Sequence, residues 1–236
     1  MTQGASSRVR IALPAAGIAS IAVAWMAHAV AASPLRPPDV GRGAIIAAQG
    51  VPPRVPACAQ CHAFGGGSDG SGAFPRIAGQ SLYYLDQQMR DLASGVRVNA
   101  VMTPIAKGLS AGEILDVTAY YASVASPFLP LASGDPNLVK RGEQLAKVGD
   151  ASRDLQSCND CHGPGGAGEP PAIPYLAGQY AHYIASQLKA WQLGFRKNSP
   201  DSMEYLAKRL GDPDIEAVAA YFQQVRTAAQ PVPSKE

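Results

Sequence analysis

Cys58-Ala59-Gln60-Cys61-His62 and Cys158-Asn159-Asp160-Cys161-His162 contain every cysteine of this 236-residue chain. Each stretch has the spacing Cys-x-x-Cys-His, which is typical of a site where a c-type heme is covalently attached. In such a site the two thiols add to the vinyl groups of the heme and the histidine reaches its iron. The chain is therefore predicted to carry two heme c groups. The thiols that would attach them are Cys58, Cys61, Cys158 and Cys161.

Two other uses of these cysteines are open at this point. In an exported protein, four cysteines could form two disulfides, with three possible pairings. Two Cys-x-x-Cys pairs could also make a structural zinc site. Neither alternative explains why a histidine directly follows each pair. The spacing therefore favours heme attachment, with His62 and His162 as axial ligands of the two irons.

The surroundings of the two motifs repeat with a period of about 100 residues. Pro75-Arg76-Ile77-Ala78-Gly79-Gln80 corresponds to Pro174-Tyr175-Leu176-Ala177-Gly178-Gln179, and Arg42-Gly43 corresponds to Arg141-Gly142. A period of this length is the size of a domain, not of a short solenoid repeat. The sequence thus predicts a duplicated module: domain 1 at 33–128, a proline-rich linker at 129–136 and domain 2 at 137–236.

Helical patterns recur in the same order in both copies, and no strand pattern is convincing, so the predicted fold class is all-α. Amphipathic spacing and capping residues mark the helices. The expected ranges are 39–49, 81–94 and 110–124 in the first copy, and 137–148, 180–193 and a last helix capped by Asp212 in the second.

A sixth ligand for each iron should be a soft donor or a second imidazole. Beyond the first 32 residues the methionines are Met89, Met102 and Met203. Met102 and Met203 stand at corresponding places before the last helix of each copy, which makes them the predicted axial ligands. Met89 corresponds to Leu188 on an apolar helix face, and a methionine that replaces leucine is a core residue. His182 is the spare histidine and is a less favoured ligand.

Aligned polar residues precede each predicted methionine ligand. Arg97 and Asn99 correspond to Arg196 and Asn198. Two roles are open for these pairs: contacts with a heme propionate or the backbone, and a position on the surface.

The first 32 residues are predicted to be a secretory signal peptide. Arg8 and Arg10 precede an apolar run from Ile11 to about Val30, and small residues follow. An uncleaved membrane anchor is the alternative, since the run is close to spanning length. Without the signal, the chain has 18 basic and 18 acidic residues. This balance gives no basic field for nucleic acid, so no nucleic-acid partner is expected.

With two such modules, each with Pro-x-x-Ala-Gly-Gln and Met-x-x-x-Ala-x-x-Leu, the chain resembles the diheme cytochrome c4 family over about residues 39–226. The resemblance implies two tandem class I cytochrome c domains, each wrapped around one covalently attached heme. It also implies that the carbonyls of Pro75 and Pro174 accept the second N–H of the axial histidines, and that the protein is periplasmic, with loose membrane association.

The resemblance implies a respiratory-chain electron carrier that takes electrons from a quinol-oxidising complex and passes them toward a terminal oxidase. An electron-accepting subunit of a periplasmic dehydrogenase is the alternative. No catalysis of its own is expected, because His/Met ligation fills both axial positions and raises the reduction potential. A diheme peroxidase, which needs an open iron, is therefore disfavoured. Asp160 and Glu169 lie near the second heme motif, so the second heme is predicted to have the lower potential.

Overall fold

A computed structural model describes Met1, residues 36–129, residue 131 and residues 134–226. Apart from Met1, the predicted signal peptide lies outside these described residues, as do the last ten residues of predicted domain 2. Within the described ranges, no helix has both the length and the apolar character that crossing a bilayer requires. The compact unit that begins at Pro37 contains all the helices described below.

The first module contains five α-helices and begins with an aspartate cap. The Asp39 side chain accepts a hydrogen bond from the N–H of Arg42, and Ser110 makes a complete capping box with Glu113. Both caps satisfy amide groups that the first helical turn leaves without partners. The helices are α1 (Val40–Gln49), α2 (Ala59–His62), α3 (Leu82–Ser94), α4 (Met102–Lys107) and α5 (Ala111–Ser123).

The second module repeats this order, with additional short turns. Its elements are α6 (Pro136–Lys147), the 3₁₀ turn η1 (Ala151–Arg153), α7 (Asn159–His162), the 3₁₀ turn η2 (Pro164–Gly166), α8 (Ala181–Gln192), the π-helical turn η3 (Pro200–Glu204), α9 (Tyr205–Ala207) and α10 (Asp212–Gln224). The cap predicted for the last helix was wrong by one residue. Gly211 is the N-cap, and the Asp212 carboxylate accepts a hydrogen bond from Lys189 instead.

Each module is built on a close crossing of its first and last long helices, α1 with α5 and α6 with α10. Glycine makes the close approach possible. A Cβ atom at Gly43 would lie 2.1 Å from the carbonyl oxygen of Asp116, and one at Gly142 would lie 2.0 Å from that of Ala217. Around each crossing lies a separate apolar core, with Ile46 and Tyr121 in the first module and Leu145 and Phe222 in the second.

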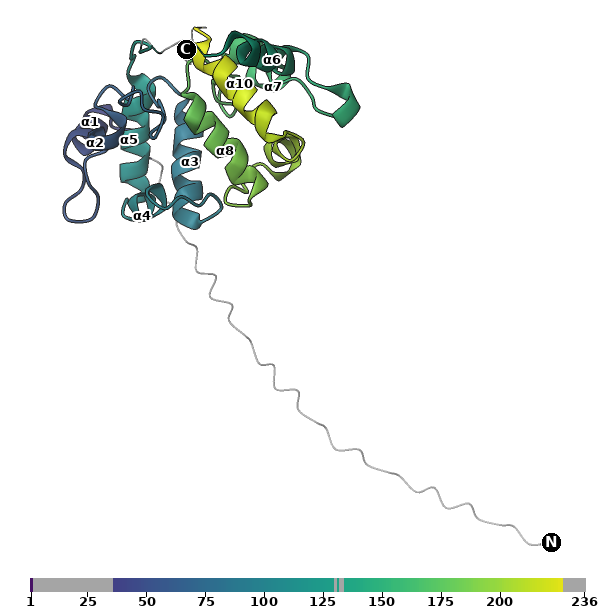
Figure 1. The fold of residues 1–236 in the computed structure, drawn as a ribbon. Coiled ribbons are helices and arrows are strands. Elements are labelled where there is room, and N and C mark those ends of the chain that lie inside the picture. Colours follow the sequence, from purple (N-terminus) through teal and green to yellow (C-terminus); the bar gives the residue numbers. More distant parts are fainter. Residues whose placement is uncertain (2–35, 130, 132–133, 227–236) are drawn as a thin grey trace, which may run out of the picture. The chain divides into compact units, whose positions relative to one another are not determined.

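The middle helices, α3 and α8, lie where the two modules meet (Figure 1), and hydrogen bonds between side chains join them through the segments that follow. Those segments pair briefly: Arg97 and Arg196 form an isolated antiparallel bridge, with Val98 N–H donating to Phe195 and Lys197 N–H donating to Val96. The described residues contain only such isolated bridges and no longer strand. The all-α prediction agrees with this arrangement.

Candidate heme sites

The two Cys-x-x-Cys-His motifs fold into matching short helices. Residues 58–62 form α2 with its preceding turn, and residues 158–162 form α7 in the same way. In both, the N–H of the histidine donates to the carbonyl of the first cysteine at 2.9 Å. This turn brings both thiols and the imidazole to one side of the backbone, because positions i, i+3 and i+4 share a helix face.

Both histidine side chains are buried and hydrogen-bonded at Nδ1. His62 Nδ1 donates to the carbonyl of Pro75 at 3.1 Å, and His162 Nδ1 donates to that of Pro174 at 2.8 Å. Burial lowers the pKa of each imidazole below its ordinary value, against the opposing effect of the carbonyl. A neutral ring with a proton on Nδ1 has a free lone pair on Nε2, which is the form that binds a metal.

The four thiols are free and only partly exposed. Burial raises the pKa of Cys58 and of Cys158 to about 11, so both are protonated at neutral pH. Among the described residues, no three histidine, cysteine or acidic side chains converge as metal ligands. The structure therefore supports neither the disulfide nor the zinc interpretation.

The two predicted methionine ligands lie in different kinds of helical turn. Met102 is the first residue of α4, and its N–H donates to the side chain of Asn99 at 2.8 Å. Met203 lies inside the π-helical turn η3, where its N–H donates to Ser199 Oγ at 3.4 Å. Single π-helical turns are uncommon and frequent at functional sites.

A continuous cavity of about 850 Å³ runs through both modules and brings the predicted site residues together. Its lining includes Cys58, Cys61, His62 and Met102 from the first copy and Cys158, Cys161, His162 and Met203 from the second. Met89 also lines it, while packing against the first apolar core. His182 is exposed and does not line the cavity.

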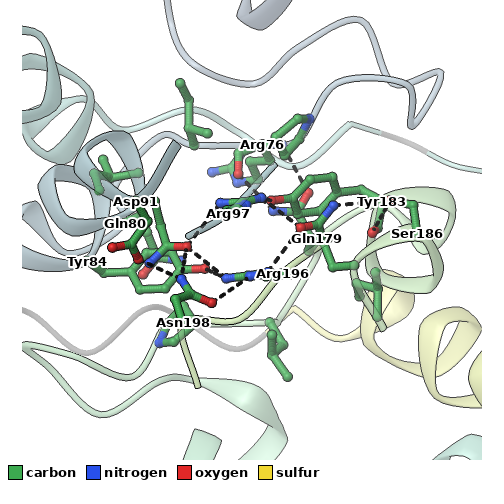
Figure 2. A pocket seen from close by; sticks show the side chains of 18 of the residues that line it. Arg76, Gln80, Tyr84, Asp91, Arg97, Gln179, Tyr183, Ser186, Arg196 and Asn198 are labelled. Carbon is green, nitrogen blue, oxygen red and sulfur yellow. Dashed lines mark hydrogen bonds between the residues drawn. The ribbon is translucent and has the colours of Figure 1, made fainter. Parts of the chain in front are cut away.

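Two facing arginines lie between the modules, at the centre of Figure 2. Arg196 is 4% exposed, and its guanidinium donates to Tyr84 and Gln88 of the first module. Arg97 donates in the opposite direction, to Tyr183 and Gln187 of the second. Because residues 97 and 196 are directly opposite in an antiparallel pair, their side chains share one face.

Neither arginine has a carboxylate oxygen within ion-pair distance among the described residues; their hydrogen-bond acceptors are neutral oxygens. Burial lowers the pKa of Arg196, and the neighbouring Arg97 adds to that effect. A further polar group is left over beside them. Trp191 is 6% exposed and lines the cavity, and its ring lies under the Arg196 guanidinium at 3.9 Å. Its indole N–H has no hydrogen-bond partner in the part of the chain that the structure describes.

These groups fit a heme, which brings carboxylates as well as an iron. Leaving a buried cation or indole N–H unpaired is costly. Heme propionates would supply the missing negative charge to Arg97 and Arg196 and an acceptor for the N–H of Trp191. Each half of the cavity also contains two thiols, one imidazole and a thioether at the predicted ligand position, Met102 in the first half and Met203 in the second, and Met89 adds a second thioether to the first half. The donor set is therefore that of two c-type hemes.

Two contacts that join the modules are not predicted by the sequence patterns. Gln179 of the second copy hydrogen-bonds the backbone of Arg76, and Gln80 of the first copy hydrogen-bonds the backbone of Tyr175. Both glutamines end the repeated Pro-x-x-Ala-Gly-Gln segment, and both are 6% exposed. The repeated segment was the available signal for these glutamines, but the partner of each glutamine lies about 100 residues away, in the other copy.

Known proteins are similar in sequence to most of this chain. No model of a protein family matches it. The thiosulfate dehydrogenase electron acceptor of Thiomonas intermedia is 38% identical over 182 residues, which are 77% of this chain and 82% of that protein. The cytochrome c4 of Pseudomonas aeruginosa is 37% identical over 169 residues, which are 70% of this chain and 82% of that protein.

Solved structures give the same result. A thiosulfate dehydrogenase, TsdBA, from Marichromatium purpuratum superposes with a TM-score of 0.73 and 37% identity, over 83% of this chain but only 43% of that one. Reduced recombinant cytochrome c4 from Pseudomonas stutzeri superposes with a TM-score of 0.70 and 31% identity, over 80% of this chain and all of the other. This chain thus spans less than half of the TsdBA chain.

Proposed function

Since the chain belongs to the diheme cytochrome c4 family, we propose that each of its Cys-x-x-Cys-His motifs holds one heme c through its two thiols. Family membership confirms the predicted fold of two cytochrome c domains and the two heme c cofactors, and it makes the chain a diheme electron carrier. The attaching residues in this proposal are Cys58 and Cys61 for the first heme and Cys158 and Cys161 for the second. Intact mass should exceed that of the polypeptide by two hemes, which acid–acetone should not extract.

The proposed axial ligands are His62 with Met102 and His162 with Met203. The observation that carries this proposal is that all four side chains line one cavity, with both imidazoles buried, neutral and hydrogen-bonded at Nδ1. Each heme supplies an iron that exchanges one electron. The protein orients the imidazoles through the two proline carbonyls, and it presents thioethers, whose soft sulfur favours reduced iron.

Electron transfer without catalysis is the activity that this ligand set supports. Two protein ligands per iron leave no open position at which a substrate could bind, so we propose that the chain is a carrier rather than an enzyme. The cavity runs through both modules, which supports electron passage from one heme to the other inside a single chain. We also propose the domain boundaries that the sequence predicts, at 33–128 and 137–236 with a linker at 129–136.

We further propose a periplasmic location after cleavage of the signal in residues 1–32. The donor would be a quinol-oxidising complex or a dehydrogenase, the acceptor a terminal oxidase, and membrane association loose. N-terminal sequencing of the purified protein tests the export step. A new N-terminus close to residue 32 supports it, whereas a retained residue 1 supports the membrane anchor.

A second candidate is electron acceptor of a thiosulfate dehydrogenase. A 38% identical relative carries that description, and TsdBA contains a similar segment within a longer dehydrogenase chain. Stopped-flow reduction of the oxidised protein separates the two. Rapid reduction by a thiosulfate dehydrogenase with thiosulfate supports the second candidate. Reduction only by a quinol-oxidising complex, followed by oxidation by a terminal oxidase, supports the respiratory shuttle.

A further inference from the structure

One peptide group in each module links the axial histidine to the opposite module. The carbonyl of Pro75 accepts the hydrogen bond from His62 Nδ1, and the N–H of the same peptide group, which belongs to Arg76, donates to Gln179 Oε1 at 3.0 Å. Gln179 Nε2 donates back to the carbonyl of Arg76 at 2.8 Å. The glutamine thus closes a two-bond pair with the first module from a position in the second.

The second module has the reciprocal arrangement. The carbonyl of Pro174 accepts from His162 Nδ1, and the N–H of Tyr175 donates to Gln80 Oε1 at 3.3 Å. Gln80 Nε2 donates to the carbonyl of Tyr175 at 3.3 Å. The bonds to Gln80 are longer than those to Gln179, so the link into the first module is the tighter of the two.

Each glutamine is held in place from its own side. The Oε1 atom of Gln80 also accepts from the N–H of Ser81, and that of Gln179 accepts from Tyr180, both at 3.1 Å. Among the described residues, the N–H of Arg76 has no other partner. The surrounding loop is anchored to its own module one residue later, where Ile77 N–H donates to Gly66 at 2.8 Å. Among the described residues, the N–H of the Pro75–Arg76 peptide group is therefore held by the other module alone, while its carbonyl is held by His62.

Hydrogen bonds in series through one amide polarise each other. An acceptor on the Arg76 N–H makes the Pro75 carbonyl a better acceptor for His62 Nδ1–H. A stronger bond at Nδ1 raises the basicity of the imidazole, which stabilises oxidised iron. We propose that Gln179 and Gln80 are positioning residues that tune the axial histidine of the opposite module. This proposal rests on the heme ligation proposed above.

The proposal predicts both the direction of each change in potential and the module in which it occurs, which is the one opposite the substituted glutamine. Both can be tested in the full diheme protein. Gln179→Leu removes the acceptor for the N–H of Arg76. It should raise the reduction potential of the first-module heme and leave that of the second-module heme unchanged. Gln80→Leu should raise the second-module heme instead, by a smaller shift. Stepwise potentiometric titration measures both potentials, and Met102→Ala and Met203→Ala assign each step to a module.

Two matched variants separate tuning from simple loosening of the interface. Ser81→Ala removes another hydrogen bond between the modules, from Ser81 Oγ to the carbonyl of Pro171 at 2.6 Å, but does not touch either histidine link. It should move neither potential. Gln179→Glu keeps the acceptor for Arg76 N–H, so it should not raise the first potential even if Gln179→Leu fails to fold.

Four results would overturn the inference. They are a shift in the potential of the heme in the mutated residue's own module, equal shifts in both potentials, no shift at all in Gln179→Leu, and a rise of the first-module potential in Gln179→Glu. These outcomes are distinguishable from failure of the heme assignment. If that assignment is wrong, the two methionine variants will not each alter one heme, whatever the glutamine variants do.

Discussion

Replacing Gly142 by alanine should separate α6 from α10. The new Cβ would lie 2.0 Å from the carbonyl oxygen of Ala217, 2.5 Å from its carbonyl carbon and 2.8 Å from Tyr221 Cβ. Two of these atoms are backbone, so no side-chain rotation relieves the contact. The two helices must therefore move apart. Because both contribute to the apolar core around the second site, this movement should loosen the packing of that core.

The size of the effect is set by two opposing terms. Alanine in a helix interior is favoured over glycine by about 1 kcal/mol. Forcing extra atoms into a packed region costs roughly 1–3 kcal/mol, and a backbone contact this short belongs at the upper end. The net loss of unfolding free energy should be about 2 kcal/mol, which for a chain of this size lowers Tm by about 4–8 °C.

Thermal unfolding of the holoprotein, followed by circular dichroism, measures the change. Gly41→Ala is the matched control, because that glycine lies in α1, is exposed, and would meet only Asp39 Oδ1 at 3.4 Å. Its Tm should be unchanged or slightly raised. A Gly142→Ala protein as stable as the Gly41→Ala protein would refute the close-crossing argument.

Three further predictions concern charge. Arg196→Gln should lower at least one heme potential, because it removes a cation that stabilises reduced iron, whereas Arg196→Lys should not; a potentiometric titration in which both behave alike contradicts this. Although burial opposes it, hydrogen bonding by two arginines holds the pKa of Asp214 below its usual range. The carboxylate therefore stabilises the fold above its unfolded pKa of about 3.9, and this stability is lost as pH falls through the lower folded value. At pH 7 the Asp214→Asn protein should have a lower free energy of unfolding than the unsubstituted protein, and it should lose less of that free energy between pH 7 and pH 3. Denaturant unfolding at the two pH values measures both; a variant that loses as much as the unsubstituted protein would contradict this role of Asp214. Finally, the second heme should titrate at the lower potential because of Asp160 and Glu169; a higher value would mean that burial outweighs these exposed carboxylates.

The long helices could be predicted from the sequence because their signals are local. Apolar spacing, the Asp39 cap and the Ser110 capping box lie within a few residues of the elements that they define, and α1 and α5 begin directly after these caps. The last helix shows how a local signal fails. Asp212 looks like a cap, but its side chain accepts from Lys189, and Gly211 takes the cap position. The partner of the Asp212 side chain lies 23 residues away, so the local sequence does not show it.

The arrangement between the modules could not be predicted in this way. The sequence repeat aligns Arg97 with Arg196, but it does not distinguish a role at the heme from a position on the surface. Only the folded chain shows that they face each other without a carboxylate partner. The roles of Gln80 and Gln179 were missed for the same reason, since their hydrogen bonds cross from one copy to the other. Periodicity within one copy contains no information about such contacts.

The most direct test of the heme assignment is the near-infrared sulfur-to-iron charge-transfer band of the oxidised diheme protein. Two His/Met irons predict a band of two-heme intensity. Met102→Ala should remove the contribution of one heme and Met203→Ala that of the other, while Met89→Ala leaves the band whole. If Met89→Ala removes a contribution, or if either predicted ligand can be replaced without loss, the assignment of axial ligands is wrong.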